Sequence, residues 1–143
     1  MSGFLIDTNV LSEYNRTGGP DAGVKRWLET TDRPIQYVSV ITLAEIQKGI
    51  ELLAKGKRRS QLEQWLQQDL EQWFSGRIIS VDRQVAARWA SLLAQLAPVG
   101  RPLPTVDSLI AATALVYDLT IVTRNTKDFE GIGVTTINPW DAP

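Results

Sequence analysis

Short apolar runs alternate with longer segments of helical periodicity along this chain. The runs that predict strands are Phe4–Ile6, Ile35–Val40, Arg77–Val81, Thr120–Thr123 and Val134–Ile137. The first run is wholly apolar, as expected of a strand buried on both faces of a parallel sheet.

The segments between these runs predict helices. Apolar residues recur at helical spacing in Ile41–Leu53, in Ser60–Phe74 and in residues 105–118. Shorter helices are predicted from Asn9, over residues 22–31, and from Asp82 to about Leu96. Asp21, Asp82 and Thr105 are predicted to cap the helices that follow them.

This alternation of strands and helices predicts an α/β fold, with a five-stranded parallel sheet flanked by helices on both faces. No internal repeat or interdomain linker is visible, so residues 1–143 are predicted to form a single domain. Ligands of such sheets bind beyond the C-terminal ends of the strands, near the point where the strand order reverses. Polar residues just after the predicted strands are therefore the first candidates for a site.

Composition removes several kinds of chemistry. The chain contains no Cys and no His, which excludes thiolate nucleophiles, zinc–thiolate sites and Ser-His-Asp catalysis. An enzyme of this composition must rely on carboxylates, Lys, Tyr, hydroxyl groups or a metal ion. The net charge is −1 and the sequence pI is about 5.4, so a broad basic surface for nucleic acid is not expected. Without a membrane-length apolar run or a signal peptide, the simplest prediction is a cytoplasmic protein.

Four carboxylates stand out, and each also has an ordinary structural interpretation. Asp7 follows the first predicted strand and can cap the next helix. Glu45 lies three residues after Thr42, which is the spacing of a capping box. Asp107 lies in the first turn of a helix, where the helix dipole favours acids, and Asp128 can form a turn.

Their joint placement is less ordinary. Asp7 and Asn125 follow predicted parallel strands, Glu45 lies early in a helix after another strand, and Asp107 opens a helix that leads into a fourth strand. All of these positions can face one cleft at one edge of the sheet. Carboxylates buried together without partners cost several kcal/mol each, roughly, and a hard divalent cation such as Mg²⁺ relieves this repulsion.

Other site motifs are absent from the chain. There is no GxxxxGK[ST] phosphate loop and no GxGxxG fingerprint. The segment DTN also lacks the second Asp of the DxDxT signature of aspartyl-phosphate phosphatases, which disfavours a phosphatase on the same kind of sheet.

Four blocks of the sequence resemble successive motifs of PIN-domain ribonucleases, above all the VapC/FitB-like toxins of bacterial toxin–antitoxin pairs. The blocks are LIDTNVLSE, VSVITLAEIQKGI, TVDSLIAATAL and IVTRNTKDFEGIGVTTINPW, in the order and spacing of that family. The resemblance implies a PIN-like (Rossmann-like) fold. It also implies a Mg²⁺-dependent endoribonuclease, with Mn²⁺ as a possible ion.

The resemblance assigns the acidic residues of the family to positions of this chain. The first Asp corresponds to Asp7, the helical Glu to Glu45, and the Asp before IAATA to Asp107. The fourth carboxylate is assigned to Asp128, while Asn125 is the alternative position in the same block. All four carboxylates are thus implied catalytic residues and metal ligands, with Asp7 and Asp107 holding the ion most directly.

The resemblance also implies residues around these carboxylates. The polar residues that line the site are Thr8, Asn9, Thr123 and Asn125. Arg124, Lys127 and Lys48 are candidate contacts to substrate, although the simpler interpretation of each is a solvated surface charge. A water on the metal ion is the expected nucleophile for in-line attack on an RNA phosphodiester, since the chain has no His.

The implied partners are an RNA substrate, a cognate antitoxin and a second copy of the chain. Operator DNA is expected only through the antitoxin. The predicted hairpin of Ile41–Leu53 and Ser60–Phe74 has more apolar residues than one sheet face needs, and the family places an antitoxin segment there. The alternative is a catalytically silent PIN module that binds antitoxin and, as a complex, DNA.

Overall fold

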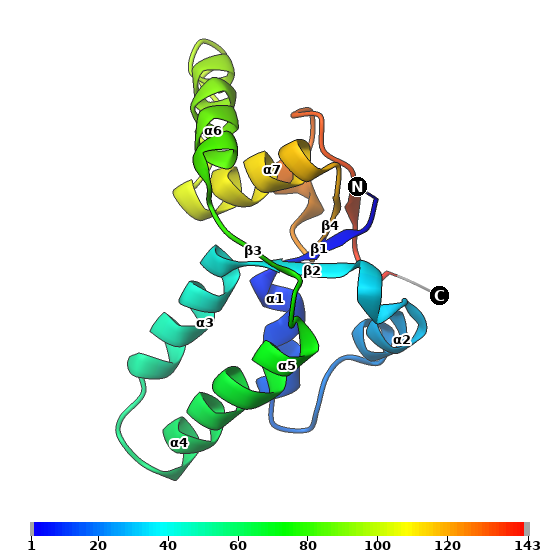
Figure 1. Ribbon diagram of the computed structural model, residues 1–143, viewed down its shortest axis with the longest axis vertical. Helices are drawn as coiled ribbons and strands as arrows, with labels where there is room; N and C mark the ends of the chain where they lie inside the picture. Colours follow the sequence, from blue (N-terminus) through cyan, green and yellow to red (C-terminus); the bar gives the residue numbers. More distant parts are fainter. Residues whose placement is uncertain (1, 142–143) are drawn as a thin grey trace.

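A five-stranded parallel sheet forms the centre of the protein in the computed structural model, which describes residues 2–141 (Figure 1). The strands lie in the order β3-β2-β1-β4-β5. Their bounds are Phe4–Ile6 (β1), Gln36–Ser39 (β2), Ile78–Ile79 (β3), Thr120–Val122 (β4) and Thr136–Ile137 (β5). The predicted five-stranded sheet is confirmed, although both edge strands are shorter than the predicted runs. Residues 1 and 142–143 of the predicted single domain lie outside the described part.

The strand order reverses between β1 and β4. From β1 the chain proceeds outward through β2 to β3, and it then returns to the opposite side of β1 as β4. Residues that follow β1 and β4 therefore lie at the switch point where sheets of this kind bind ligands.

The predicted helices are present, with shifted ends. The α-helices are Thr8–Leu11 (α1), Ala22–Thr30 (α2), Val40–Glu51 (α3), Lys57–Gln64 (α4), Glu71–Trp73 (α5), Arg83–Leu96 (α6) and Thr105–Tyr117 (α7). The 3₁₀ turns are Ser12–Asn15 (η1), Arg33–Ile35 (η2) and Thr126–Phe129 (η4), and a π-helical segment covers Trp65–Leu70 (η3). Within residues 2–141, no helix combines the length and apolar character needed to cross a membrane.

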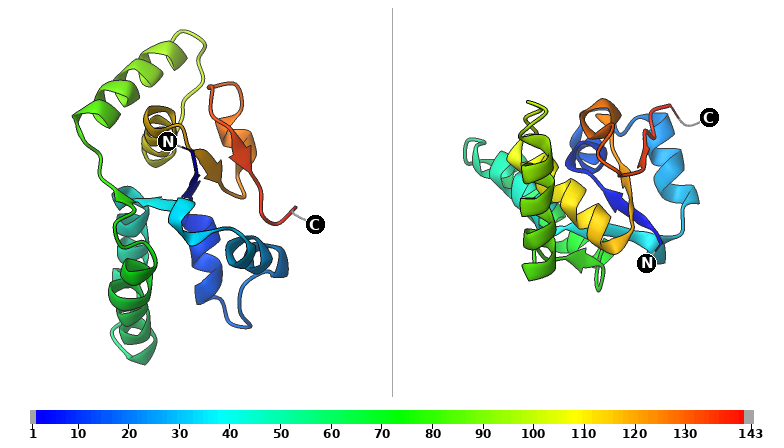
Figure 2. Two further views of the ribbon diagram at one scale, coloured as in Figure 1. Left: turned by 45° about the vertical axis from the view of Figure 1, so that its right-hand side comes forward. Right: turned by 90° about the horizontal axis from the view of Figure 1, so that it is seen from above.

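Helices cover both faces of the sheet. Helices α6 and α7 lie on one face, and α1 to α5 lie on the other (Figure 1, Figure 2). The two neighbouring residues Leu5 and Ile6 are both fully buried but belong to different core clusters, because successive side chains of a strand point to opposite faces. Strand β1 is therefore buried on both sides, as its apolar run predicts.

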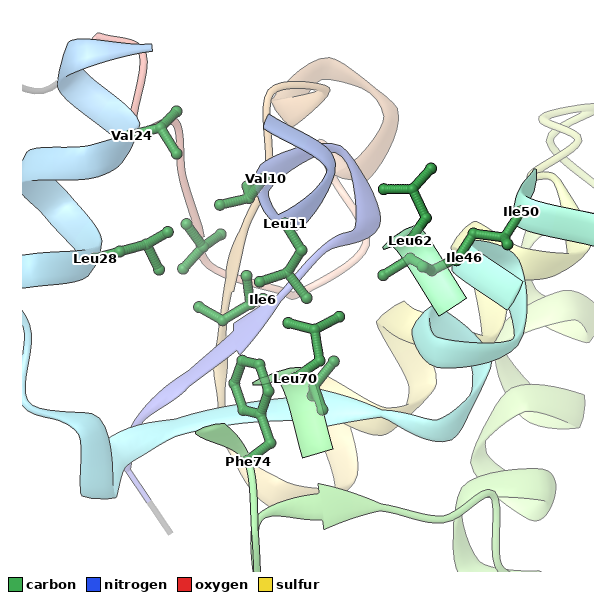
Figure 3. Close-up of a cluster of buried hydrophobic side chains, with 12 residues drawn as sticks. Ile6, Val10, Leu11, Val24, Leu28, Ile46, Ile50, Leu62, Leu70 and Phe74 are labelled. Atoms are coloured by element: carbon green, nitrogen blue, oxygen red, sulfur yellow. The ribbon is translucent and has the colours of Figure 1, made fainter. Parts of the chain in front are cut away.

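The cluster on the α1–α5 face joins residues of β1, β2 and β4 to several helices (Figure 3). Its labelled members are Ile6, Val10, Leu11, Val24, Leu28, Ile46, Ile50, Leu62, Leu70 and Phe74. This packing holds α1 and the second half of α3 against the sheet. Both helices carry candidate site residues.

Two of the three predicted helix caps are confirmed. Asp21 accepts hydrogen bonds from the backbone of Gly23 and Val24, and Asp82 accepts one from the backbone of Val85 at 2.8 Å. The predicted cap Thr105 is wrong. It is the first residue of α7, because the extended residue before it is a proline.

The prediction of one continuous α-helix over Ser60–Phe74 is also wrong, because the π-helical segment η3 separates α4 from α5. A π-helical turn holds one more residue than an α-helical turn, so it shifts the buried face along the sequence. The apolar pattern predicts Trp73 on the buried face, whereas Phe74 is the fully buried residue and Trp73 is half-buried.

Candidate functional site

Asp7 lies directly after β1 and is the N-cap of α1. Its Oδ1 accepts a hydrogen bond from the backbone N of Thr8 at 2.8 Å, and its Oδ2 accepts one from the hydroxyl of Thr123 at 2.8 Å. The capping role that the sequence allows is therefore present, but it occupies only one oxygen. The hydroxyl of Thr123 holds the second oxygen at the end of β4. The side chain of Asp7 is buried, since the residue is only 6% exposed.

Thr123 connects the ends of β1 and β4. Besides donating to Asp7, its hydroxyl oxygen accepts hydrogen bonds from Asn9 Nδ2 and from the backbone N of Asn125, each at 3.1 Å. Asn9 Oδ1 accepts a further hydrogen bond from the backbone N of Arg124 at 3.1 Å. The residues predicted to line the site thus belong to one hydrogen-bonded network, in which Asn125 takes part through its backbone.

Glu45 joins this network from α3, where the hydroxyl of Thr8 donates to Glu45 Oε1 at 2.5 Å. The capping-box interpretation of Glu45 is wrong, because α3 begins directly after Ser39. The hydroxyl of Ser39 caps the helix by accepting a hydrogen bond from the backbone N of Ile41 at 3.0 Å. The hydroxyl of Thr42 is buried and has no hydrogen-bond partner among the described residues.

Asp107 and Asp128 interact electrostatically with the residues after β1. Asp107 lies in the first turn of α7, and Asp128 lies in η4. Burial, and then the negative charges of Asp7, Asp128 and Glu45, raise the pKa of Asp107 from 3.8 to about 6. Burial also raises the pKa of Asp7, with smaller effects from Glu45 and Asp128, while hydrogen bonds to its carboxylate act in the opposite direction. The structure therefore brings the four predicted carboxylates into mutual range, and we call Asp7, Glu45, Asp107 and Asp128 the acidic cluster.

No basic side chain forms an ion pair with the acidic cluster within residues 2–141. The two ion pairs of this part of the chain are Arg16–Glu13 and Arg59–Glu63. In the same residues, no three acidic side chains are grouped closely enough to hold one metal ion together. The cluster is thus an uncompensated set of like charges rather than a closed ligand cage.

The candidate cations occupy different surroundings. The guanidinium of Arg124 lies over the ring of Trp140, 5.0 Å from its centroid. Lys127 lines a hollow of about 210 Å³ together with Asp128. Lys48 follows Glu45 by one turn of α3, and no hydrogen bond or ion pair of the described residues connects it to the acidic cluster. Lys127 therefore has the clearest placement beside the cluster.

One cation near the cluster was not predicted from the sequence. Arg101, in the loop before α7, donates from Nη2 to the carbonyl of Asp128 at 2.9 Å and from Nη1 to the carbonyl of Glu130. These partners lie 27 and 29 residues further along the chain. No local pattern indicates such a contact, so only the fold reveals it.

Known proteins are similar to this chain in sequence and in fold. The plasmid stability protein StbB of Pseudomonas syringae pv. tomato is 40% identical over 138 residues, which cover 96% of this chain and 99% of StbB. Toxin FitB of Neisseria gonorrhoeae is 38% identical, over 95% of this chain and 97% of FitB. The VapC ribonuclease Y4jK of Sinorhizobium fredii is 34% identical, over 96% of this chain and 97% of Y4jK.

Two solved structures superpose closely on this one. The crystal structure of FitAcB from Neisseria gonorrhoeae has a TM-score of 0.90 at 38% identity, and covers 96% of this chain and 99% of that chain. A structure of FitAB bound to an IR36 DNA fragment also has a TM-score of 0.90, at 36% identity, and covers 98% of this chain and 97% of that chain. The sequence model of the family described as "PIN domain" matches residues 4–134 of this chain. The resemblance seen in the sequence is confirmed, and the chain belongs to the PIN-domain family.

Proposed function

We propose that this protein is a Mg²⁺-dependent endoribonuclease and the toxin of a toxin–antitoxin pair. The acidic cluster carries the proposal, because its carboxylates act electrostatically on Asp7 and Asp107 near the switch point of the sheet, and no basic side chain forms an ion pair with them within residues 2–141. Relatives named VapC ribonuclease and Toxin FitB, each more than 30% identical over nearly the whole chain, support it.

The residues present suit a hard divalent cation. Every donor of the acidic cluster is an oxygen, and Mg²⁺ prefers oxygen ligands while it keeps several waters. Asp7 and Asp107 would hold the ion most directly, with Glu45 and Asp128 acting through waters. Mn²⁺ has the same ligand preference and is the alternative ion.

The chain's own residues orient the site for RNA. Thr8 holds the carboxylate of Glu45, and Thr123 holds that of Asp7, so both acids are fixed before a substrate arrives. Arg124 and Lys127 at the rim would attract the phosphates of the RNA. A bound Mg²⁺ would supply a water of lowered pKa and positive charge against the phosphoryl oxygens.

Cleavage of RNA by the purified protein tests the proposal. We expect cleavage with Mg²⁺ and none with EDTA. Asp7→Asn and Asp107→Asn should each lower the rate at least about 100-fold, because each removes a charge that holds the ion. Asp118→Asn is the matched control, since it makes the same change at the exposed left-handed end of α7 (φ 53°), where Asn fits well. Wild-type rates in both cluster variants would contradict the proposal.

The partner proposed from the family is an antitoxin segment in a groove of the helical hairpin. A hollow of about 610 Å³ lies between α3 and the arm formed by α4, η3 and α5. Its apolar lining comes from Val40, Leu43, Ala44, Ile50 and Leu66. Its charged lining comes from Glu51, Glu63, Glu71 and Arg59, of which Arg59 pairs with Glu63 at 3.5 Å, so the lining remains acidic in balance. Such a surface suits an amphipathic helix with basic residues. A basic side chain that extends from this segment to the acidic cluster would displace the metal ion and inhibit the enzyme.

The proposed assembly also includes a homodimer and, through the antitoxin, operator DNA. A solved structure of FitAB bound to an IR36 DNA fragment, 36% identical to this chain, supports a DNA-bound assembly. A catalytically silent module would bind antitoxin and DNA equally well but would leave RNA intact. The cleavage experiment therefore separates the two functions.

A further inference from the structure

Arg101 connects the loop before α7 with the turn η4, which carries Asp128. It lies in the segment between α6 and α7, six residues before Asp107. Its guanidinium donates to the backbone carbonyls of Asp128 and Glu130, which flank the end of η4. One side chain thus joins the approach to α7 with the turn that presents Asp128.

The turn η4 has little else to hold its outer side. Phe129 is 1% exposed and anchors the inner side in the α6–α7 core cluster, whereas Asp128 and Glu130 are exposed. The turn's own backbone hydrogen bonds, from Asp128 N to Asn125 O and from Glu130 N to Lys127 O, measure 3.1 and 3.3 Å. Among the described residues, Arg101 is the hydrogen-bond donor to the carbonyls of Asp128 and Glu130.

The turn η4 carries a carboxylate, Asp128, that is repelled by the other carboxylates of the acidic cluster. Asp128 lies within range of both Asp107 and Asp7, and like charges push the turn outward when no metal ion is bound. The guanidinium of Arg101 donates hydrogen bonds to the carbonyls of Asp128 and Glu130, so it resists this movement without neutralising the carboxylate of Asp128. Its planar fork of donors suits two neighbouring acceptors, which an ammonium group cannot match.

We propose that Arg101 is a positioning residue that clamps η4 and so keeps Asp128 in place beside Asp7 and Asp107. The inference rests on the proposed metal-dependent nuclease function. Its competitor is a direct contact of Arg101 with RNA phosphate, because Arg101 and Lys127 line the same hollow of about 210 Å³. A clamp acts on turnover and on metal affinity, whereas a phosphate contact acts on substrate binding.

The experiment compares Arg101→Met with Arg101→Lys, and uses Arg83→Met on the exposed start of α6 as the matched control. Three quantities are measured: kcat and KM on a short RNA, Mn²⁺ affinity by calorimetry, and amide hydrogen exchange over residues 125–131. Arg101→Met should lower kcat and Mn²⁺ affinity about tenfold, as expected for a residue that orients a ligand, with KM unchanged. Exchange should become faster in residues 125–131 alone. Arg101→Lys should recover part of each loss, and it also serves if Arg101→Met does not fold.

Other outcomes would contradict the proposed positioning role of Arg101. A raised KM with unchanged kcat, metal affinity and hydrogen exchange would assign Arg101 to RNA binding. Unchanged exchange over residues 125–131 in both variants would remove the positioning role altogether. If the wild-type protein cleaves no RNA, the nuclease proposal fails, while exchange and Mn²⁺ affinity still decide whether Arg101 holds the turn.

Discussion

Asp7 shows how one carboxylate can serve both the fold and a site. One oxygen caps α1 through the backbone of Thr8, and the other receives the hydroxyl of Thr123. Burial raises its pKa while these hydrogen bonds lower it. Two fixed donors therefore keep the side chain in one orientation, which a metal ligand needs and a solvent-exposed helix cap does not.

Asp107 makes the stability of the metal-free protein depend on pH. Its pKa is about 6 in the folded protein, compared with the ordinary 3.8 in the unfolded chain. Between these pH values the folded state binds more protons, so stability falls as the pH rises from about 4 to about 6. We expect Asp107→Asn to remove this loss. In EDTA it should raise Tm by about 2–4 °C at pH 7.5, roughly 1 kcal/mol, because solvent screens this half-buried site.

The two proteins should unfold at similar temperatures near pH 3, which lies below both pKa values, so that Asp107 is mostly protonated in the folded and in the unfolded state. Calorimetric scans from pH 3 to pH 8 measure the difference. An Asn variant that is less stable than wild type at pH 7.5 would show that Asp107 is not repelled by Asp7, Asp128 and Glu45.

Asp128 and Asn125 compete for the fourth position of the site. Asp128 acts electrostatically on Asp7 and Asp107, whereas Asn125 contacts Thr123 through its backbone N, which any residue supplies. We therefore expect Asp128→Ala to lower Mg²⁺-dependent cleavage about tenfold, and Asn125→Ala to lower it less. Cleavage rates at several Mg²⁺ concentrations measure both effects. The reverse order would place the functional side chain at Asn125.

Local patterns predicted some residues of the site better than others. Asp7 and Asp107 could be found because each lies where a strand end or a helix start meets the switch point. The local context of Glu45 was misleading, because a Thr three residues earlier imitates a capping box while its real partner Thr8 lies 37 residues away. Arg101 could not be found at all, since its acceptors are distant backbone carbonyls with no sequence signature.

At the scale of elements, periodicity gave the order and type of the strands and main helices but not their irregularities. The segment η3 has the same apolar spacing as its helical neighbours, so its π-helical conformation leaves no mark in the sequence. Trp65 is the first residue of η3 and lies in the hairpin where an antitoxin segment is proposed to bind. In the structure it is half-buried and packs against the core, so it is unsuitable for testing a partner surface.

Gln67 is the better test of the hairpin groove. It is exposed and lines the hollow between α3 and η3, whereas its neighbour Gln68 is exposed but does not line it. Gln67→Arg adds bulk and positive charge where a basic antitoxin segment is proposed to bind. We expect it to weaken antitoxin binding at least about tenfold, or roughly 1.4 kcal/mol, without changing RNA cleavage. Calorimetric titration measures the affinity, and Gln68→Arg should bind antitoxin like wild type. Equal affinities for the two variants would move the antitoxin site elsewhere.

At the scale of the whole molecule, the sheet is poorly suited to joining two copies edge to edge. Its edge strands β3 and β5 are two residues long each, and such short edges offer few backbone groups for pairing. We therefore expect a homodimer to use helices. Helix α6 packs on α7 at one end of the molecule (Figure 2). On its exposed side the small residues Ala86, Ala90 and Ala94 recur at a spacing of four, which allows close approach of a second helix.

We expect light scattering on the isolated protein to give about twice the chain mass of 15.9 kDa. If α6 forms the interface, Ala90→Arg should shift the mass to that of a monomer, because a long charged side chain on the small-residue stripe prevents close helix packing and would have to be desolvated. Ser91→Arg is the matched control: it lies next to Ala90 and is also exposed, but it does not belong to the stripe. A dimer that survives Ala90→Arg would place the interface on other helices. A wild-type protein that is monomeric at all concentrations would refute the homodimer and leave the nuclease proposal intact, since each copy contains its own acidic cluster.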